Sequence, residues 1–567
     1  MVKTVDTTTF IQGRNMMKRF GLKKVFSIAI IIAFLLGTNQ MSSTAAENRI
    51  FNDMPHTGNV FADMEKQIDY FKEDGNIRND IAVRTLKMHI SGVALFQKQG
   101  QTDKVIKQMQ SFKRLLDNQK SNGGISGIAH DVLNTYTQYV IGKINGSFNS
   151  DNVMKHIKHL SVDIGPREAG SEGERAGAEY IESVLKSYGY ETKIEEAPRS
   201  NRVELILKVL SDNNKKLPLR AVSGAPQTTG DGITGNVYHA GAGQPSDFTA
   251  AASGKIALIK NGGITAGAKV QNAMAAGAIG VLIYDNQDRF TLPSVSLGSV
   301  RPNIPVATIT KKDGEAFVSQ LSKGNVEVQL SIKTLTNQKT VNVIAVKKPK
   351  GIENPEIYYI GSHLDSVAFA PGANDDASGT STLMELARIF KDYDGDKELR
   401  FAAFGGEELG FVGSKYHIGN LSQDEVKRTK VQFQMDMTGT AWVPASQLFI
   451  NTVDGKSNLV SQSTHQAAEK LDINKDLLPV HMLSRSDHVP FHEKGVPSAL
   501  FIWMEPGTPP GGADIEPYYH SLEDKIEHVS PERLQLTGDV VFKAISDLIG
   551  FQKNSGKNED ASLKDAS

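Results

Sequence analysis

The sequence predicts a protein of the α/β class, preceded by a bundle of helices. Four apolar runs within residues 341–552, "EIYYI", "LRFAAF", "KVQFQM" and "SALFIWM", are nearly continuous, as expected of central strands in a sheet that helices cover on both faces. Residues 60–143 instead repeat apolar side chains at helical spacing, with turn signals at 74–76 and 122–124. A chain of 567 residues is also too long for one core, so we expect several domains.

Residues 1–46 have the composition of a signal peptide. Four basic residues between positions 18 and 24 precede an apolar stretch, residues 25–37, and small residues follow at 44–46, where cleavage would occur. The alternative is a membrane anchor, but the apolar stretch falls short of the roughly 20 residues that a spanning helix needs. We therefore predict a secreted protein with no stable membrane anchor.

Residues 55–146 are expected to form a helical domain. Leu86, Ile90, Val93 and Ala94 lie on one face of a helix at this spacing. The segment "ALFQKQGQTDKVIKQMQSFKRLLDNQ" resembles the FIMAH domain, a helical module attached to secreted enzymes of Gram-positive bacteria. The resemblance implies a helical architecture and export of the Gram-positive type, but it implies no chemistry.

Residues 151–202 are expected to begin a second domain, with helices at 154–160 and 176–188. Residues 203–335 then change to short Val/Ile strands, and "GKIALIKNGG" and "AIGVLIYDN" flank the expected helix "AGAKVQNAMAAGA". This pattern predicts a small α/β insert. It resembles the protease-associated (PA) domain, which implies a cap beside an active site without catalytic groups; a spacer that only stabilises the fold is the alternative. The polar residues 553–567 are predicted to be a disordered tail.

Charge and composition exclude several classes of function. The chain has 63 basic and 64 acidic residues, a formal charge of −1, so no basic excess indicates nucleic acid or an anionic membrane as a partner. It has no cysteine, which excludes disulfides and leaves histidine and carboxylate side chains as the ligands of any metal site.

Residues of the kind that bind metals follow three of the four apolar runs. "EIYYI" leads into "GSHLDS", "LRFAAF" into "GGEE", and "KVQFQM" into "DMTG". Ligands of open α/β sheets bind beyond the carboxyl ends of the strands, so these side chains should converge. "PGANDDASGTS" and "EPYYHSLED" add two aspartates and a histidine. Each motif alone is common, because Asp-Asp before a helix is usually a cap and paired glutamates are usually solvated. Together they predict a site for one or two divalent ions.

The same motifs resemble the M28 metallopeptidases. "GSHLDSV", "PGANDDASGTS", "FGGEELGFVGS", "MDMTG", "SRSDHVPFHEKGVPSALFI" and "PYYHSLEDKIEHV" occur in the family's order, over roughly residues 152–550. The likeness is greatest to secreted bacterial double-zinc aminopeptidases with a PA insert. It implies a zinc-exopeptidase fold, a mixed sheet flanked by helices, of which residues 341–552 would form the larger part.

The resemblance also implies the ligands of two zinc ions. Carried over residue by residue, it assigns His363 and Asp436 to one zinc, Glu408 and His520 to the other, and Asp375 as the bridge between them.

Four further residues receive roles outside the ligand set. The resemblance makes Glu407 the general base, and we expect extended backbone at Glu407 and Glu408 to direct these side chains to opposite sides. Asp365 is expected to orient His363, and Asp487 to support the site. Tyr519 is a candidate donor to the tetrahedral oxyanion, with ordinary aromatic packing as the alternative.

The implied function is that of a secreted zinc aminopeptidase, a hydrolase that acts on peptides with a free N-terminus. Acidic groups such as Glu407 and Asp436 would meet the substrate's amine. Three alternatives remain open at this point. A carboxypeptidase would need a cation for the terminal carboxylate, for which Arg485 is a candidate; a glutaminyl cyclase has a related fold but uses a single zinc; and a binding protein could have lost catalysis on the same fold. The sequence does not give the preferred substrate residue.

Overall fold

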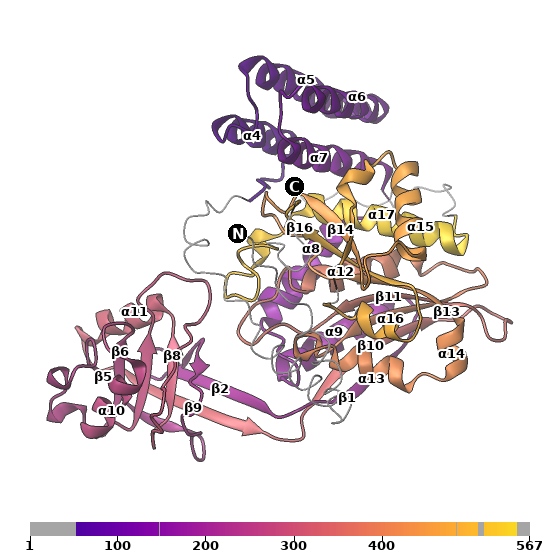
Figure 1. The fold of residues 1–567 in the computed structure, drawn as a ribbon. Coiled ribbons are helices and arrows are strands. Elements are labelled where there is room, and N and C mark those ends of the chain that lie inside the picture. Colours follow the sequence, from indigo (N-terminus) through magenta and orange to yellow (C-terminus); the bar gives the residue numbers. More distant parts are fainter. Residues whose placement is uncertain (1–52, 147, 484, 508–514, 553–567) are drawn as a thin grey trace, which may run out of the picture. The chain divides into compact units, whose positions relative to one another are not determined.

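The computed structural model describes residues 53–146, 148–483, 485–507 and 515–552 (Figure 1). The predicted signal peptide, residues 1–46, and the predicted disordered tail, residues 553–567, lie outside the described residues. Within the described ranges, none of the helices combines the length and the apolar character needed to cross a membrane.

Four helices form the N-terminal domain: α4 (Val60–Glu73), α5 (Asp80–Lys98), α6 (Thr102–Ser121) and α7 (Gly127–Asn145). Asn59, Asn79 and Ser126 cap the first, second and fourth of them, each accepting a backbone N–H. The apolar faces predicted from the spacing meet in one core. Val443, far along the chain, belongs to that same core, and α7 packs against α17 (Pro531–Ile549). The helical domain therefore shares part of its core with the larger domain.

A mixed sheet of eight strands forms the centre of the larger domain, and this confirms the predicted fold class. The strand order is β1 (Glu191–Pro198), β10 (Lys339–Lys347), β12 (Glu398–Phe404), β11 (Ile357–His363), β13 (Thr429–Met435), β16 (Ser498–Met504), β14 (Gln447–Thr452) and β15 (Val480–Met482). The four predicted central runs are β11, β12, β13 and β16, which are mutually parallel. β11, β12 and β16 are buried along their whole length and β13 everywhere except Lys430, which explains why their sequences are largely apolar without alternation.

Helices cover both faces of this sheet. One apolar core joins its strands to α8 (Ser150–Lys158), α9 (Glu172–Ser187), α12 (Ala377–Phe390), α15 (Leu459–Lys470) and α17. A second core on other strand residues includes side chains of α13 (Val412–Asn420), α14 (Gln423–Arg428) and α16 (His488–Glu493). Short helical turns complete the described chain: η1 (His159–Ile164), η2 (Pro245–Asp247), η3 (Ala250–Ala252), η4 (Glu407–Leu409), η5 (Lys475–Leu477) and η6 (Ile526–His528).

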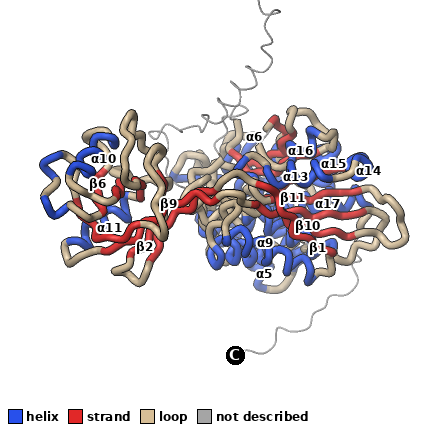
Figure 2. The backbone as a smooth tube through the Cα atoms, turned by 90° about the horizontal axis from the view of Figure 1, so that it is seen from below, coloured by secondary structure: helices blue, strands red, loops and turns tan. Residues whose placement is uncertain are grey.

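The insert has its own mixed sheet. Its order is β3 (Lys215–Leu217), β2 (Arg202–Val209), β9 (Glu327–Leu335), β5 (Ile233–His239), β6 (Ile256–Lys260), β7 (Gly280–Tyr284), β8 (Val306–Ile309) and β4 (Arg220–Ala221), with α10 (Ala266–Ala275) and α11 (Lys311–Leu321). Strands β6 and β7 are parallel and α10 connects them, as the sequence pattern predicts. Figure 2 shows the long strands β2 and β9, which pair side by side.

Candidate metal centre

Adjacent parallel strands end at the same edge of the sheet and place the predicted ligands there. His363 is the last residue of β11, Asp436 directly follows β13, and Glu408 lies four residues beyond the end of β12. Asp375 lies two residues before α12, and His520 comes from the loop between β16 and η6. The chain therefore collects acidic and imidazole groups from five segments at one edge.

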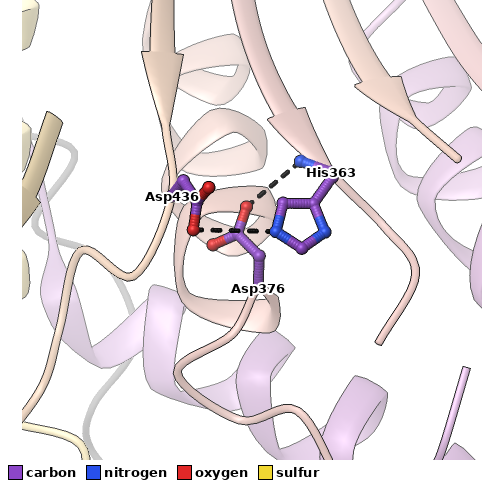
Figure 3. Close-up of side chains that lie close together, drawn as sticks. All are labelled: His363, Asp376 and Asp436. Carbon is purple, nitrogen blue, oxygen red and sulfur yellow. Dashed lines mark hydrogen bonds and ion pairs between the residues drawn. The ribbon is translucent and has the colours of Figure 1, made fainter. Parts of the chain in front are cut away.

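Two groups of potential ligands are formed there, each within 4.8 Å: His363, Asp376 and Asp436, and Asp375, Glu408 and His520. Figure 3 shows the first group, where His363 Nε2 lies 3.6 Å from Asp436 Oδ1. In the second group, His520 Nε2 lies 2.9 Å from Glu408 Oε2.

Asp375 joins the two groups. Its Oδ1 lies 3.1 Å from His363 Nε2, and its Oδ2 lies 3.2 Å from His520 Nε2. The buried carboxylate of Asp524 holds the backbone of this segment by accepting the N–H groups of Asn374 (2.7 Å) and Asp375 (3.1 Å). One oxygen of Asp375 thus faces each histidine, as a bridging ligand requires.

Asp376 belongs to the first group, but its carboxylate also accepts backbone N–H groups. It is the N-cap of α12, and it accepts the N–H of His363 at 3.1 Å (Figure 3). It also accepts the N–H groups of Gly379 (2.7 Å) and Met437 (3.1 Å). The peptide bond between Asp375 and Asp376 is cis. The hydrogen bonds and ion pairs distinguish the two neighbouring aspartates: Asp376 fixes the backbone, and the carboxylate of Asp375 faces the imidazoles.

The expected extended backbone at Glu407 and Glu408 is wrong. Gly406 has φ = +67°, and Glu407–Leu409 form the 3-10 turn η4. The Asp365 carboxylate accepts both of the glutamate N–H groups, at 3.1 and 3.4 Å. A glycine at a left-handed position allows the turn to follow the strand directly, so a tight turn and not a strand separates the two carboxylates.

Asp365 contacts His363 mainly through its backbone. His363 Nδ1 lies 3.1 Å from the carbonyl oxygen of Asp365 and 3.6 Å from its Oδ1. This carbonyl fixes the orientation of the ring and leaves Nε2 facing the carboxylates, while the Asp365 side chain holds η4.

Asp487 and Tyr519 lie at the edge of the centre. Asp487 is buried, accepts the hydroxyl of Ser414, and has one oxygen with no partner among the described residues. Burial raises the pKa of Asp487 to about 7. Tyr519 is 40% exposed as a residue, and its ring stacks on His520, with ring centroids 3.8 Å apart.

The electrostatics of the site fit bound cations. Burial lowers the pKa of His520, but Glu408 and Asp375 outweigh it and raise the value to about 11. The pKa of His363 is likewise raised despite burial, because Asp436 and Asp376 face it. Burial and the charge of Asp375 raise the pKa of Glu408, and its buried Oε1 has no partner among the described residues. Imidazole and carboxylate groups such as these are the donor set that zinc binds.

Arg167, which the sequence pattern did not single out, is buried close to these carboxylates. Its guanidinium donates to five backbone carbonyl oxygens, of Leu160, Gly165, Leu364, Pro371 and Gly372. Leu364 follows His363, and Gly372 precedes Asp375 by three residues. Arg167 therefore fixes both ligand-bearing segments, and its positive charge offsets part of the negative charge of the centre.

Arg167→Met should lower the free energy of unfolding by about 3 kcal/mol, because buried carbonyl groups lose their donor. Urea denaturation of the zinc-free protein measures this value. Arg301→Met is the matched control, since Arg301 is exposed and donates to the carbonyls of Gly298 and Val300, and a surface change typically stays within about 0.5 kcal/mol. Equal stability of the two variants would contradict the role of Arg167.

Comparison with known proteins matches three segments of the chain to family models. The model of peptidase family M28 matches residues 342–545, that of the FIMAH domain residues 61–142, and that of the PA domain residues 223–317. Aminopeptidase YwaD of Bacillus subtilis (strain 168) is 44% identical over 406 residues, which cover 72% of this chain and 86% of that protein. Leucine aminopeptidase 2 of Trichophyton equinum is 27% identical over 401 residues, 67% of this chain and 79% of that protein.

One solved structure also resembles this chain in fold and in sequence. BSAP, a zinc aminopeptidase from Bacillus subtilis, aligns with a TM-score of 0.52 and 42% sequence identity, covering 72% of this chain and 97% of that chain.

Proposed function

The chain belongs to peptidase family M28, and on that premise we propose that it is an exported aminopeptidase that uses two zinc ions to remove N-terminal residues from peptides. The observation that carries the proposal is the position of Asp375, with one carboxylate oxygen facing each of two histidines. Such a carboxylate can serve two metal ions at once, as in aminopeptidases with paired metals.

The proposed ligands divide between the two ions as follows: His363 and Asp436 for one, Glu408 and His520 for the other, and Asp375 for both. Zinc bound there would polarise the scissile carbonyl and make water more acidic. Ser486 donates to Asp436 Oδ2 at 2.8 Å, which leaves Oδ1 directed at His363. Support of this kind keeps ligand oxygens in one orientation.

Glu407 is the proposed general base. Burial and the charge of Glu408 raise the pKa of the Glu407 carboxyl, while His363 and any bound cation favour its ionised form. The carboxylate would take a proton from the attacking water and deliver it to the departing amine.

Tyr519 is the proposed donor to the carbonyl oxygen of the substrate as that oxygen becomes negative. Desolvation around the hydroxyl, together with the charges of Asp375 and Glu408, raises the pKa of Tyr519, so its hydroxyl keeps a proton at neutral pH. Its 40% exposure leaves the ring accessible to a substrate.

The alternative functions receive less support. The relatives with substantial identity are named aminopeptidases. Arg485, the cation that a carboxypeptidase would use, is exposed. A cyclase with a single zinc does not need a carboxylate that faces two imidazoles. A protein that has lost catalysis is not expected to keep all the proposed ligands together with the proposed base.

Acetylating the substrate's N-terminus should slow its hydrolysis by about 100-fold or more, because a charged amine among carboxylates forms charge-assisted hydrogen bonds that a neutral amide cannot. Matched peptides with free and acetylated N-termini, compared by kcat/KM and by the order of residues released, test this. Equal rates, or release from the C-terminus, would refute the aminopeptidase proposal.

Export should leave a mature protein that begins at or near Glu47, because small residues precede that position. N-terminal sequencing of the protein recovered from culture medium identifies the first residue of the mature chain. Recovery of the chain in the membrane fraction with residues 25–37 intact would contradict export by cleavage.

A further inference from the structure

Residues 515–525, which lead into η6, bear two proposed site residues, Tyr519 and His520, and depend on their neighbours for their shape. His520 has φ = +53°, a left-handed backbone conformation that is unfavourable for a side chain with a Cβ. Surrounding contacts must hold it. Tyr518, the residue just before this pair, is only 3% exposed and therefore packs closely against its neighbours. It provides such contacts.

Tyr518 is fixed by Asp53, from the opposite end of the described chain. Its hydroxyl donates to the Asp53 carboxylate, 3.3 and 3.2 Å from the two oxygens. Its ring stacks on His528, with centroids 3.7 Å apart and planes 15° apart, and His528 Nδ1 lies 2.6 Å from Asp53 Oδ2. One carboxylate thus holds both ends of the segment 518–528.

Asp53 is itself held by backbone pairing. It forms an antiparallel bridge with Trp442, and the N–H of Met54 donates to the carbonyl of Ala441 at 2.8 Å. The N–H of Ala441 donates in turn to the carbonyl of His528 at 2.7 Å. Three distant segments therefore lie side by side, so the position of the Asp53 carboxylate is defined relative to the loop.

The same segment connects to the helical domain. The carbonyl of Pro55 accepts the hydroxyl of Tyr136 on α7 at 2.8 Å, and His56 Nδ1 lies 3.0 Å from Glu532 Oε1 on α17. Residues 53–56 therefore link the helical domain to the loop that bears His520.

We propose that Asp53 is a positioning residue for the metal centre: by fixing Tyr518 and His528 it holds Tyr519 and His520 in the conformation that binds zinc. The inference rests on the proposed function. It gives residues 53–56, which lead into the helical domain, a role in shaping the metal site in addition to attaching that domain. The competing explanation is that Asp53 only attaches the two domains to each other.

Lys113 provides the control that separates these explanations. Its ammonium lies 2.8 Å from Asp472 Oδ1 and also donates to the Asp472 carbonyl, so Lys113 joins the helical domain to the larger domain at a residue outside the segment 515–528. Lys113→Met breaks this attachment and keeps most of the apolar stem. Asp53→Ala and Tyr518→Phe break the contact on the loop, and Tyr518→Phe removes a single hydroxyl.

The experiment measures zinc affinity by competition with a chelating dye, kcat and KM on a peptide with a free N-terminus, and hydrogen exchange of residues 515–525 in the zinc-free protein. In Asp53→Ala and Tyr518→Phe we expect one of the two zinc ions to bind about 10-fold more weakly, kcat to fall by a similar factor, and exchange to accelerate. The double variant should be little worse than Asp53→Ala, because Asp53→Ala already breaks the contact that Tyr518→Phe removes. Lys113→Met should keep the zinc affinity of the unmodified protein.

Wild-type zinc affinity and exchange in Tyr518→Phe would overturn the inference, even if Asp53→Ala does not fold. Equal weakening of zinc binding by Lys113→Met would favour simple attachment of the domains. Failure of the unmodified protein to bind two zinc ions or to cleave the peptide would instead overturn the proposed function, so the two failures are distinguishable.

Discussion

Glu407→Gln should reduce kcat by roughly 10²–10⁴-fold, the usual contribution of a general base, while zinc content stays near that of the unmodified protein. Glutamine keeps the size of the side chain but cannot accept the proton. Glu408→Gln should behave differently, because a neutral amide replaces an anionic ligand that lies 2.9 Å from His520. That variant should lose zinc, and added zinc should partly restore its activity.

Metal analysis and steady-state kinetics on the two variants separate these outcomes, after circular dichroism shows that each variant is folded. Loss of zinc from Glu407→Gln with retention by Glu408→Gln would reverse the two assignments. Full activity in both variants would place the catalytic site elsewhere.

Removal of zinc by a chelator should abolish activity and lower the free energy of unfolding. Free zinc at about 1,000 times its Kd would stabilise the folded state by about 4 kcal/mol per site. The size of this effect should depend on pH, because a ring nitrogen that binds zinc must first lose its proton. Zinc affinity should therefore rise between pH 6 and pH 8, by up to about tenfold per pH unit for each proton released.

The zinc-free protein should show the opposite trend. The pKa of His520 is raised from 6.5 to about 11 in the folded state, so its contribution to stability is full below pH 6.5 and is lost as the pH rises toward 11. Melting temperatures at pH 6, 7 and 8, with and without zinc, measure both trends. His520→Gln is the control. Both the pH dependence of zinc affinity and the pH dependence of zinc-free stability should be weaker in this variant. A zinc affinity that does not change with pH would contradict the assignment of imidazole ligands.

The sequence predicted the parts of the site that depend on local pattern. Continuous apolar runs indicated β11, β12, β13 and β16, and the parallel pairing of these strands brings His363 and Asp436 to one edge. The pattern alone could not separate Asp375 from Asp376. Their difference depends on the N–H groups of Gly379 and Met437, which meet Asp376 only after α12 and β13 pack together.

The remaining features depend on contacts that no local pattern encodes. The turn at Glu407 follows from the left-handed Gly406, and a glycine pair alone does not distinguish such a turn from extended chain. Arg167 and Asp53 act on segments hundreds of residues away in sequence. In the sequence each looks like an ordinary surface charge. Only in the folded chain is Arg167 buried and Asp53 paired with a distant residue.

The pairing of β1 with β10 gives the insert an unusual independence. The two strands form an antiparallel ladder in which Pro198 lies opposite Lys339, and the N–H of Arg199 extends it by donating to the carbonyl of Gln338. The chain thus leaves the central sheet at the end of β1 and returns at the start of β10, where the two strands are hydrogen-bonded to each other. A hairpin turn of a few residues could join the same two strand ends. Because closing a longer loop adds only about 0.6 kcal/mol per doubling of its length, a whole domain at the tip of this strand pair costs the central sheet little, and the sheet keeps its register.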